Sequence, residues 1–270
     1  MNKDISPDFF AKNRDSWNKR TEFHLKSSFY NMEGFLKGEN SLQKIELNLI
    51  GAIKGKSILH LQCHFGQDTL SLARMGANVT GIDLSDVSIE KAKKLNSDLG
   101  LNANFICCNL YDLPKHLNET FDLVFTSYGA IGWLPDLKKW GDIISQYLKP
   151  GGTFILVEFH PFIWMFDQQF KEIQYSYFNF GPIEESCVGT YADPQADFSH
   201  ETVGWNHHFG EVFNSIIQSG LSILDFQEYD YSPYNCLWNL KEDKKGEFRI
   251  IGLEKKIPLV YSILALKKTS

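Results

Sequence analysis

The sequence predicts an α/β protein whose mostly parallel, seven-stranded β-sheet carries helices on both faces. Three observations support this fold class. Short apolar runs alternate with amphipathic stretches between residues 57 and 159, glycines close several of the helical stretches, and a helix and two strands follow residue 208. Strands separated by helices of this length form right-handed βαβ units, which build a parallel sheet.

Each element follows from local periodicity and its flanking turn residues. Residues 1–50 have an amphipathic helical pattern, in which Ser41 is expected to cap a helix that ends near Ile50. The seven predicted strands are Ser57–Leu61, Asn78–Ile82, Ala103–Cys107, Phe121–Thr126, Thr153–Phe159, Ser222–Tyr229 and Ile257–Leu266. The remaining predicted helices are Gly66–Met75, Ser85 or Asp86 to Leu99, Leu137–Leu148 and Phe209–Ser219.

The chain is predicted to form a single domain, residues 1–270, because it contains neither an internal repeat nor a Ser/Gly-rich linker. Residues 1–52 form a helical N-terminal arm that is expected to act as a lid, and residues 53–160 form the regular core. Residues 161–206 are an aromatic-rich insertion after the fifth strand. Residues 207–270 supply the final helix and strand pair.

Composition narrows the classes of function. The 270 residues are 43% hydrophobic, enough for a substantial core, and the net charge of −6 does not favour a polyanionic partner, so nucleic acid is not expected. The charged run 241–246 is expected to be solvated surface. Five cysteines in no framework spacing indicate reduced thiols and a cytoplasmic protein. Met1–Asp8 lacks a signal-peptide core, and no apolar run is long enough to span a membrane.

The stretch Ile58–Asp68, ILHLQCHFGQD, leads from a strand into a helix, where α/β proteins bind nucleotides. Asp83 follows the second strand 17 positions after Gly66 (83 − 66). A cap for the following helix is its alternative role, but Ser85 and Asp86 are better placed for that. Asp83 is therefore expected to accept hydrogen bonds from ribose hydroxyls. A pyrophosphate requires several residues without side chains, but Gln62 and His64 would crowd it. A nicotinamide dinucleotide is therefore disfavoured, and a nucleoside without phosphates is favoured.

Five segments in order resemble the class I S-adenosylmethionine-dependent methyltransferases, which have a Rossmann-like fold. They are ILHLQCHFG (58–66), VTGIDLS (79–85), CCNLYDLP (107–114), FDLVF (121–125) and LKPGGTF (148–154). The helical arm and the LQCHFG variant further resemble a bacterial subgroup with unassigned substrates. The final strand pair resembles the reversed seventh strand of that family.

The resemblance implies S-adenosylmethionine as cofactor, S-adenosylhomocysteine as product, and no metal. The implied cofactor-binding residues are Gln62, Cys63, His64, Phe65, Gly66, Asp83, Leu84, Asn109, Leu110 and Ser127. Four positions depart from the family pattern. His60 replaces an acid, Gln62 and His64 replace glycines, and Asn109 replaces another acid.

Candidate catalytic and substrate-binding residues follow the strand ends and the aromatic segments. The candidate bases are His160, Tyr128 and His207, and the candidate substrate contacts are Tyr30, Tyr128, Trp133 and His160. A structural hydrogen bond before Pro161 is an equally good interpretation of His160. Cys63 and His64 have no CxxC or HxxxH partner nearby, so they are expected to line the loop and not to bind metal.

The leading hypothesis is a methyltransferase that acts on a small-molecule acceptor by in-line transfer. The acidic charge and the aromatic insertion favour such an acceptor, because small-molecule pockets are commonly apolar and aromatic. The alternative is a non-catalytic protein on the same fold that binds the cofactor or a partner, motivated by the altered Gln62 and His64 loop. A nicotinamide oxidoreductase ranks last, because its glycine-rich loop is absent.

Overall fold

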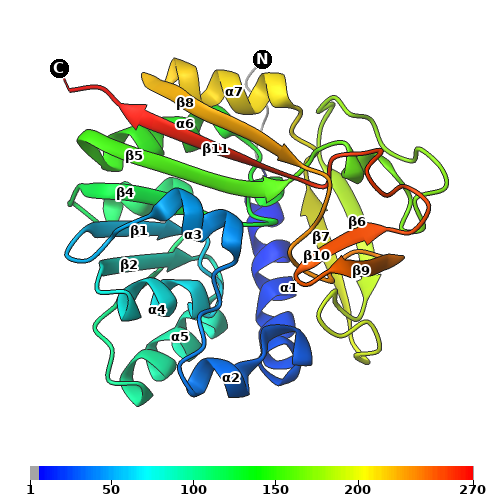
Figure 1. Cartoon of the computed structure of the whole chain (residues 1–270), viewed down its shortest axis with the longest axis horizontal. Coiled ribbons are helices and arrows are strands. Elements are labelled where there is room, and N and C mark those ends of the chain that lie inside the picture. Colours follow the sequence, from blue (N-terminus) through cyan, green and yellow to red (C-terminus); the bar gives the residue numbers. More distant parts are fainter. Residues whose placement is uncertain (1–5, 270) are drawn as a thin grey trace.

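A seven-stranded sheet forms the centre of the chain (Figure 1) in a computed structural model that describes residues 6–269. Residues 1–5, on which most of the signal-peptide prediction rests, and residue 270 lie outside the described residues. The spatial order of the strands is β3 (Asn104–Cys107), β2 (Asn78–Asp83), β1 (Ser57–Leu61), β4 (Phe121–Thr126), β5 (Leu148–Phe159), β11 (Val260–Lys267) and β8 (Leu221–Tyr229). β11 alone runs in the direction opposite to the other six strands. The predicted mostly parallel seven-stranded sheet is confirmed.

Helices cover both faces of this sheet. One face carries α3 (Lys44–Ile50), α4 (Gln67–Arg74) and α5 (Asp86–Asp98), and the other carries α6 (Leu137–Tyr147) and α7 (Phe209–Gln218). Ile58 packs into the cluster that contains the apolar residues of α3, whereas its neighbour Leu59 packs into the cluster around Trp140 of α6. Successive strand residues point to opposite faces, so a sheet covered on both sides requires the continuous apolar run of β1.

The N-terminal arm lies across the carboxyl ends of the strands. It consists of α1 (Pro7–Lys26), the short helix η1 (Ser28–Tyr30) and α2 (Met32–Leu36), and α1 packs against α5 and against the insertion. The prediction that Ser41 caps the following helix is wrong. Gln43 is the N-cap of α3, whereas the Ser41 hydroxyl donates to Asp68 Oδ1 at 2.6 Å and so joins the arm to α4.

The insertion is more regular than its sequence indicated. It contains η4 (Ile163–Met165) and an antiparallel pair, β6 (Ile183–Val188) and β7 (Ser199–Gly204). Two further short helices, η2 (Leu110–Lys115) and η3 (Ile131–Trp133), follow β3 and β4. These additions place aromatic side chains opposite the carboxyl ends of the sheet.

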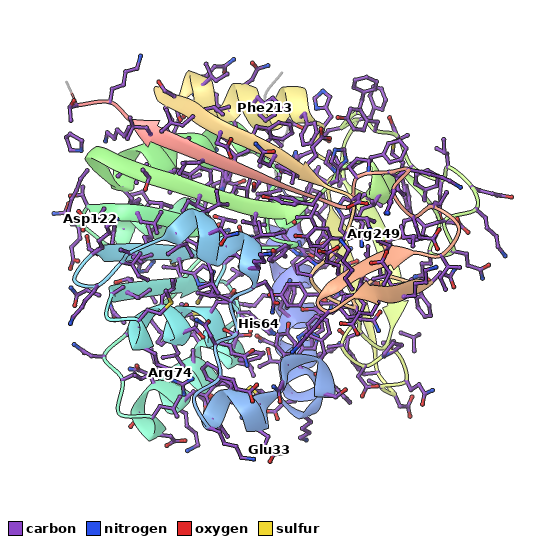
Figure 2. All side chains as sticks on the ribbon, in the orientation of Figure 1. Glu33, His64, Arg74, Asp122, Phe213 and Arg249 are labelled. Carbon is purple, nitrogen blue, oxygen red and sulfur yellow. The ribbon has the colours of Figure 1, made fainter. Side chains whose placement is uncertain are left out.

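A second hairpin, β9 (Leu240–Lys244) and β10 (Glu247–Ile250), precedes β11, which begins at Val260, three residues after its predicted start. The charged run 241–246 does form exposed surface, but its charges hid the strand pattern. Arg249, 4% exposed, holds the hairpin through ion pairs with Asp230, Asp243 and Glu247 (Figure 2).

Candidate active site

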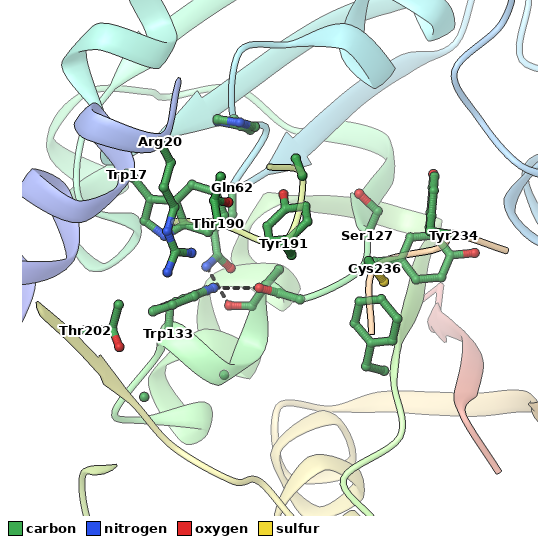
Figure 3. A pocket seen from close by; sticks show the side chains of 18 of the residues that line it. Trp17, Arg20, Gln62, Ser127, Trp133, Thr190, Tyr191, Thr202, Tyr234 and Cys236 are labelled. Carbon is green, nitrogen blue, oxygen red and sulfur yellow. Dashed lines mark hydrogen bonds between the residues drawn. The ribbon is translucent and has the colours of Figure 1, made fainter. Parts of the chain in front are cut away.

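A cavity of about 1530 Å³ lies between the carboxyl ends of β1, β2, β3 and β4, the arm helix α1 and the insertion. All ten predicted cofactor-binding residues line it, as do Tyr30, Tyr128, Trp133 and His207. His160 does not line it. The structure therefore brings together predicted residues that are up to 177 positions apart in the sequence (207 − 30). Figure 3 shows part of the cavity lining.

The loop after β1 keeps a glycine-like backbone with only one glycine. Gln62 and His64 have φ angles of 55° and 52°, in the left-handed region that costs a residue with a side chain roughly 1–2 kcal/mol. Gly66 also has a positive φ, 77°, and a Cβ there would lie 2.6 Å from the Phe105 ring. Gly66 is therefore required by packing as well as by backbone conformation, whereas the other two positions need only tolerate the turn.

Hydrogen bonds from the strand ends hold this loop. The His64 backbone N–H donates to Asp83 Oδ2 at 2.8 Å, and Gln62 Nε2 donates to the Ala130 carbonyl at 2.8 Å. Asp83 Oδ1 accepts from the Ser85 N–H at 2.8 Å. Ser85 itself caps α5, as predicted, so Asp83 is not the cap. Burial raises the pKa of Asp83 to about 6.

The residues that depart from the family pattern have identifiable partners. His60 is buried, its Nδ1 lies 2.8 Å from Thr69 Oγ1, and its Nε2 lies 3.5 Å from the Ser127 hydroxyl. Burial lowers the pKa of His60 to about 3, so a neutral imidazole occupies the position of the family's acid. Asn109 Oδ1 accepts from the Tyr111 N–H and caps η2, which holds the buried Leu110 at the cavity wall.

Two of the three candidate bases are engaged elsewhere. His160 Nε2 lies 2.9 Å from Glu228 and its Nδ1 accepts from the Phe162 N–H, while its ring packs on Phe209. The prediction that His160 contacts the substrate is corrected, because its ring packs beside β8 and α7, away from the cavity lining. The structural hydrogen bond before Pro161 is the interpretation that the geometry supports.

His207 lines the cavity, but its two ring nitrogens are occupied. Nε2 lies 2.7 Å from the Leu134 carbonyl and Nδ1 lies 2.9 Å from Glu211. The Asn179 amide nitrogen also lies 3.4 Å from Nδ1, so both nitrogens are engaged within the protein and neither is placed to take a proton from a substrate. The candidate role of His207 as a base is corrected for this reason.

Tyr128, the third candidate base, has a buried carboxylate behind it. Its hydroxyl donates to Glu46 Oε2 at 2.8 Å, and Glu46 in α3 is fully buried. Burial, assisted by the nearby Asp68, raises the pKa of Glu46 to about 7. The sequence analysis missed Glu46, although a signal was present, since it stands four residues from both Leu42 and Ile50 in an otherwise apolar helical stripe.

Glu158 at the end of β5 orders the loop that follows β4. Its buried carboxylate accepts from the backbone N–H groups of Gly129, Ala130 and Ile131. Trp133 Nε1 donates to the Gly129 carbonyl at 2.7 Å. The 128–133 segment therefore presents Tyr128 and Trp133 to the cavity from a fixed backbone.

Helix α1 closes over the first loop. Trp17 meets the ring of His64 at 5.1 Å and that of Trp133 at 5.5 Å, both edge-on, and Thr21 Oγ1 lies 2.7 Å from Ser88 Oγ. His24 Nδ1 lies 2.9 Å from His64 Nε2, and burial lowers the pKa of both imidazoles. His64 lies at the centre of the molecule in Figure 2, under this arm.

No group of three or more His, Cys, Asp or Glu side chains within residues 6–269 is arranged to hold a metal ion. Cys63 and His64 are neighbours in the loop and hold other partners. Within the same residues, no helix has the length and apolar character needed to cross a membrane.

The sheet order, with β11 reversed between β5 and β8, and the cavity at the carboxyl ends of the strands define a Rossmann-like methyltransferase fold. Comparison with known proteins agrees. A methyltransferase-domain family model matches residues 58–152. A structure of an S-adenosylmethionine-dependent methyltransferase from Mesorhizobium loti superposes with a TM-score of 0.57 at 21% identity, covering 86% of this chain and 99% of that one.

Curated relatives are also methyltransferases. An uncharacterized methyltransferase from Synechocystis sp. is 35% identical over 131 residues, 48% of this chain and 59% of that protein. The ubiquinone biosynthesis O-methyltransferase of Coxiella burnetii is 26% identical over 228 residues, 81% of this chain and 87% of that protein. The family model and these relatives support a class I S-adenosylmethionine-dependent methyltransferase, as the motifs indicated, with the methyltransferase domain matched over residues 58–152.

Proposed function

We propose that this methyltransferase transfers the methyl group of S-adenosylmethionine to a small-molecule acceptor and releases S-adenosylhomocysteine. The observation that carries the proposal is the continuity of the cavity. Gly66 and Asp83 line one part of it, and the aromatic side chains of the arm and insertion line the rest. One continuous cavity can therefore hold cofactor and acceptor in contact.

The residues of the first loop fit the cofactor. The Asp83 carboxylate accepts from the His64 and Ser85 backbone N–H groups, and a carboxylate with about four acceptor sites keeps capacity for a ribose hydroxyl donor. Gln62 Oε1 is buried without a hydrogen-bond partner among the described residues. A buried orphan acceptor is costly, and the α-ammonium group of the cofactor would satisfy it.

The walls of the cavity serve orientation and water exclusion. Bound S-adenosylmethionine supplies an electrophilic methyl group on a sulfonium whose sulfur leaves as a neutral thioether. Because little negative charge develops on the leaving group, no metal is required. The chain's task is to align the nucleophile with the methyl group. Such alignment can lower the activation free energy by up to roughly 7–11 kcal/mol. Glu158 contributes by fixing the 128–133 backbone.

Tyr128 and Glu46 are the proposed proton acceptor for a hydroxyl or protonated amine nucleophile. The acceptor's proton passes to Tyr128 Oη while the tyrosine's own proton passes to Glu46 Oε2, so that the tyrosine stays neutral. A carboxylate with a pKa of about 7 suits this role, since general bases work best when their pKa lies near the working pH.

The proposal places the protein in the cytoplasm and assigns it no nucleic-acid substrate. Arg20 is the sole lysine or arginine among the described residues that line the cavity, whereas Asp68, Asp83 and Glu158 all line it. A phosphate backbone would meet few cations here. The altered loop that motivated a non-catalytic role keeps its turn with Gln62 and His64 in the left-handed conformation, so we do not propose that role.

Calorimetric titration with S-adenosylhomocysteine, and separately with NADH, tests the cofactor assignment. We expect saturable binding of S-adenosylhomocysteine alone. Asp83→Ala is expected to weaken it about 100-fold, because hydrogen bonds to a charged group contribute roughly 1.5–3 kcal/mol each. Asp98→Ala, which removes only an exposed ion pair with Lys94, is the matched control.

The contrary result is equally definite. If S-adenosylhomocysteine fails to bind at millimolar concentration, or if NADH binds instead, the proposal is refuted. Where binding is found, a panel of small phenols, amines and carboxylic acids is incubated with S-adenosylmethionine. The mass gain of one methylene in any member then identifies the acceptor class.

A further inference from the structure

Arg20 is a buried cation without an anionic partner. It stands on α1, is 8% exposed, and directs Nε and Nη2 at the same atom, His200 Nε2, at 3.2 and 2.8 Å. No described carboxylate forms an ion pair with it, and no described group accepts a hydrogen bond from its Nη1. Burial lowers the pKa of Arg20. The guanidinium therefore retains donors that the protein does not satisfy.

His200 does not neutralise this charge. Burial, with Arg20 nearby, lowers the pKa of His200 to about 4, so the imidazole is neutral. Since its Nε2 accepts from Arg20, its proton resides on Nδ1, and Nδ1 is buried without a partner among the described residues. A neutral acceptor satisfies a donor but leaves the full positive charge in place.

Two indole rings contact the guanidinium. Its central carbon lies 4.9 Å from the Trp17 ring centroid and 5.4 Å from that of Trp133, and Figure 3 shows Arg20 beside both rings. Cation–π contacts contribute roughly 0.5–2 kcal/mol each, less than the several kcal/mol that burial of an ion costs. The rings orient the planar group without compensating its charge.

Arg20 lines the cavity and is the only lysine or arginine among the described residues that do so. A guanidinium presents a planar fork of donors that matches the two oxygens of a carboxylate. We propose that Arg20 is the carboxylate-binding residue of this cavity and holds a ligand's carboxylate beside Trp17 and Trp133. This carboxylate belongs either to the methionine part of the cofactor or to an acid group on the acceptor. Both assignments rest on the proposed function.

Two pairs of ligands test the proposal and separate the sources. S-adenosylhomocysteine is compared with methylthioadenosine, which keeps the nucleoside but lacks the amino-acid carboxylate. Benzoate is compared with benzamide, its neutral counterpart, on protein both free and saturated with S-adenosylhomocysteine. Each is titrated calorimetrically into wild type and Arg20→Gln, whose amide can still donate to His200.

We expect Arg20→Gln to weaken one carboxylate ligand at least tenfold while its neutral counterpart changes less than twofold. If only S-adenosylhomocysteine loses affinity, the carboxylate that Arg20 binds belongs to the cofactor. If only benzoate loses affinity, that carboxylate belongs to the acceptor. Arg20→Lys, which keeps the charge but not the fork, should give an intermediate loss. Arg74→Gln is the control, because Arg74 also stacks on an aromatic ring, Phe35, but lies outside the cavity lining (Figure 2).

Equal effects of Arg20→Gln on both members of each pair, or no effect on either pair, would overturn the proposal. Thermal unfolding of each variant shows whether it is folded, and Arg20→Lys decides if the glutamine variant is not. Should the wild type fail to bind S-adenosylhomocysteine, the proposed function fails. The benzoate titration of free protein would still decide the role of Arg20.

Discussion

The two sides of the cavity are built differently. On the side of the first loop, side chains are tied to backbone, as Asp83 is to the His64 and Ser85 N–H groups and Gln62 to the Ala130 carbonyl. On the side of the arm and insertion, several contacts join one side chain to another, although the Asn13 amide pairs with the Val203 backbone. Tyr30 and Tyr191 share a hydrogen bond of 2.5 Å, Phe23 stacks on Phe198, and Arg20 faces His200.

The difference shows how one fold serves many acceptors. Backbone partners survive most substitutions, so a loop defined by backbone geometry tolerates glutamine and histidine where the family has glycine. A wall made of side-chain pairs changes shape with every substitution. We therefore expect the loop side to fix the common cofactor and the insertion side to determine which acceptor enters.

The largest expected effect on the free energy of unfolding comes from Gly66, the loop position at which packing excludes a side chain. Gly66→Ala should lower the free energy of unfolding by about 4 kcal/mol, from the strained positive φ together with overlap with Phe105 and Ala92. Gly55→Ala has nearly the same φ, 80°, but open space around it, and should lose only about 1 kcal/mol. Urea unfolding measures both, and equal losses would show that packing plays no part.

The second prediction concerns Glu46, which lies behind Tyr128, and the dependence of protein stability on pH. Its pKa is raised from 4.5 to about 7 on folding, so the folded state binds its proton more tightly, and this stabilisation is lost as the pH rises from about 4.5 through 7. Glu46→Gln should therefore match wild type at pH 4.5 and exceed its stability at pH 8 by up to about 3 kcal/mol.

Urea unfolding of both proteins between pH 4.5 and 8 measures this difference directly, because the other carboxyl groups with raised pKa values, Asp68, Asp83 and Glu158, are present in both. A difference that does not vary with pH would show that Glu46 titrates normally, and Tyr128 would then lose its proposed proton acceptor.

The smallest expected effect sharpens the comparison on the insertion side. Phe198→Ala removes the stack on Phe23, whose ring centroids lie 4.6 Å apart, and should lower the free energy of unfolding by about 1 kcal/mol. Affinity for S-adenosylhomocysteine should stay within twofold. Phe180→Ala, at a ring that is 85% exposed, is the neutral control. A large loss of cofactor affinity in Phe198→Ala would mean that the two sides are not independent.

The sequence by itself determined the sheet and its cofactor loop. Short apolar runs that alternate with amphipathic stretches are typical of parallel strands covered on both faces, and consecutive parallel strands place Gly66 and Asp83 at the same edge of the sheet. Ser85 was likewise recognisable as a helix cap from its neighbours. These features depend on periodicity and turn chemistry, which act over a few residues.

Only the tertiary structure decided the chemistry of the side chains around the cavity. Arg20 meets His200 across 180 positions, and Glu46 meets Tyr128 across 82, so no local pattern pairs them. His160 was expected in the cavity from its place at a strand end, but its ring rotates toward Glu228 on β8. The direction of a side chain depends on what packs beside it, and in this molecule those neighbours come from the arm, the insertion and the final strands.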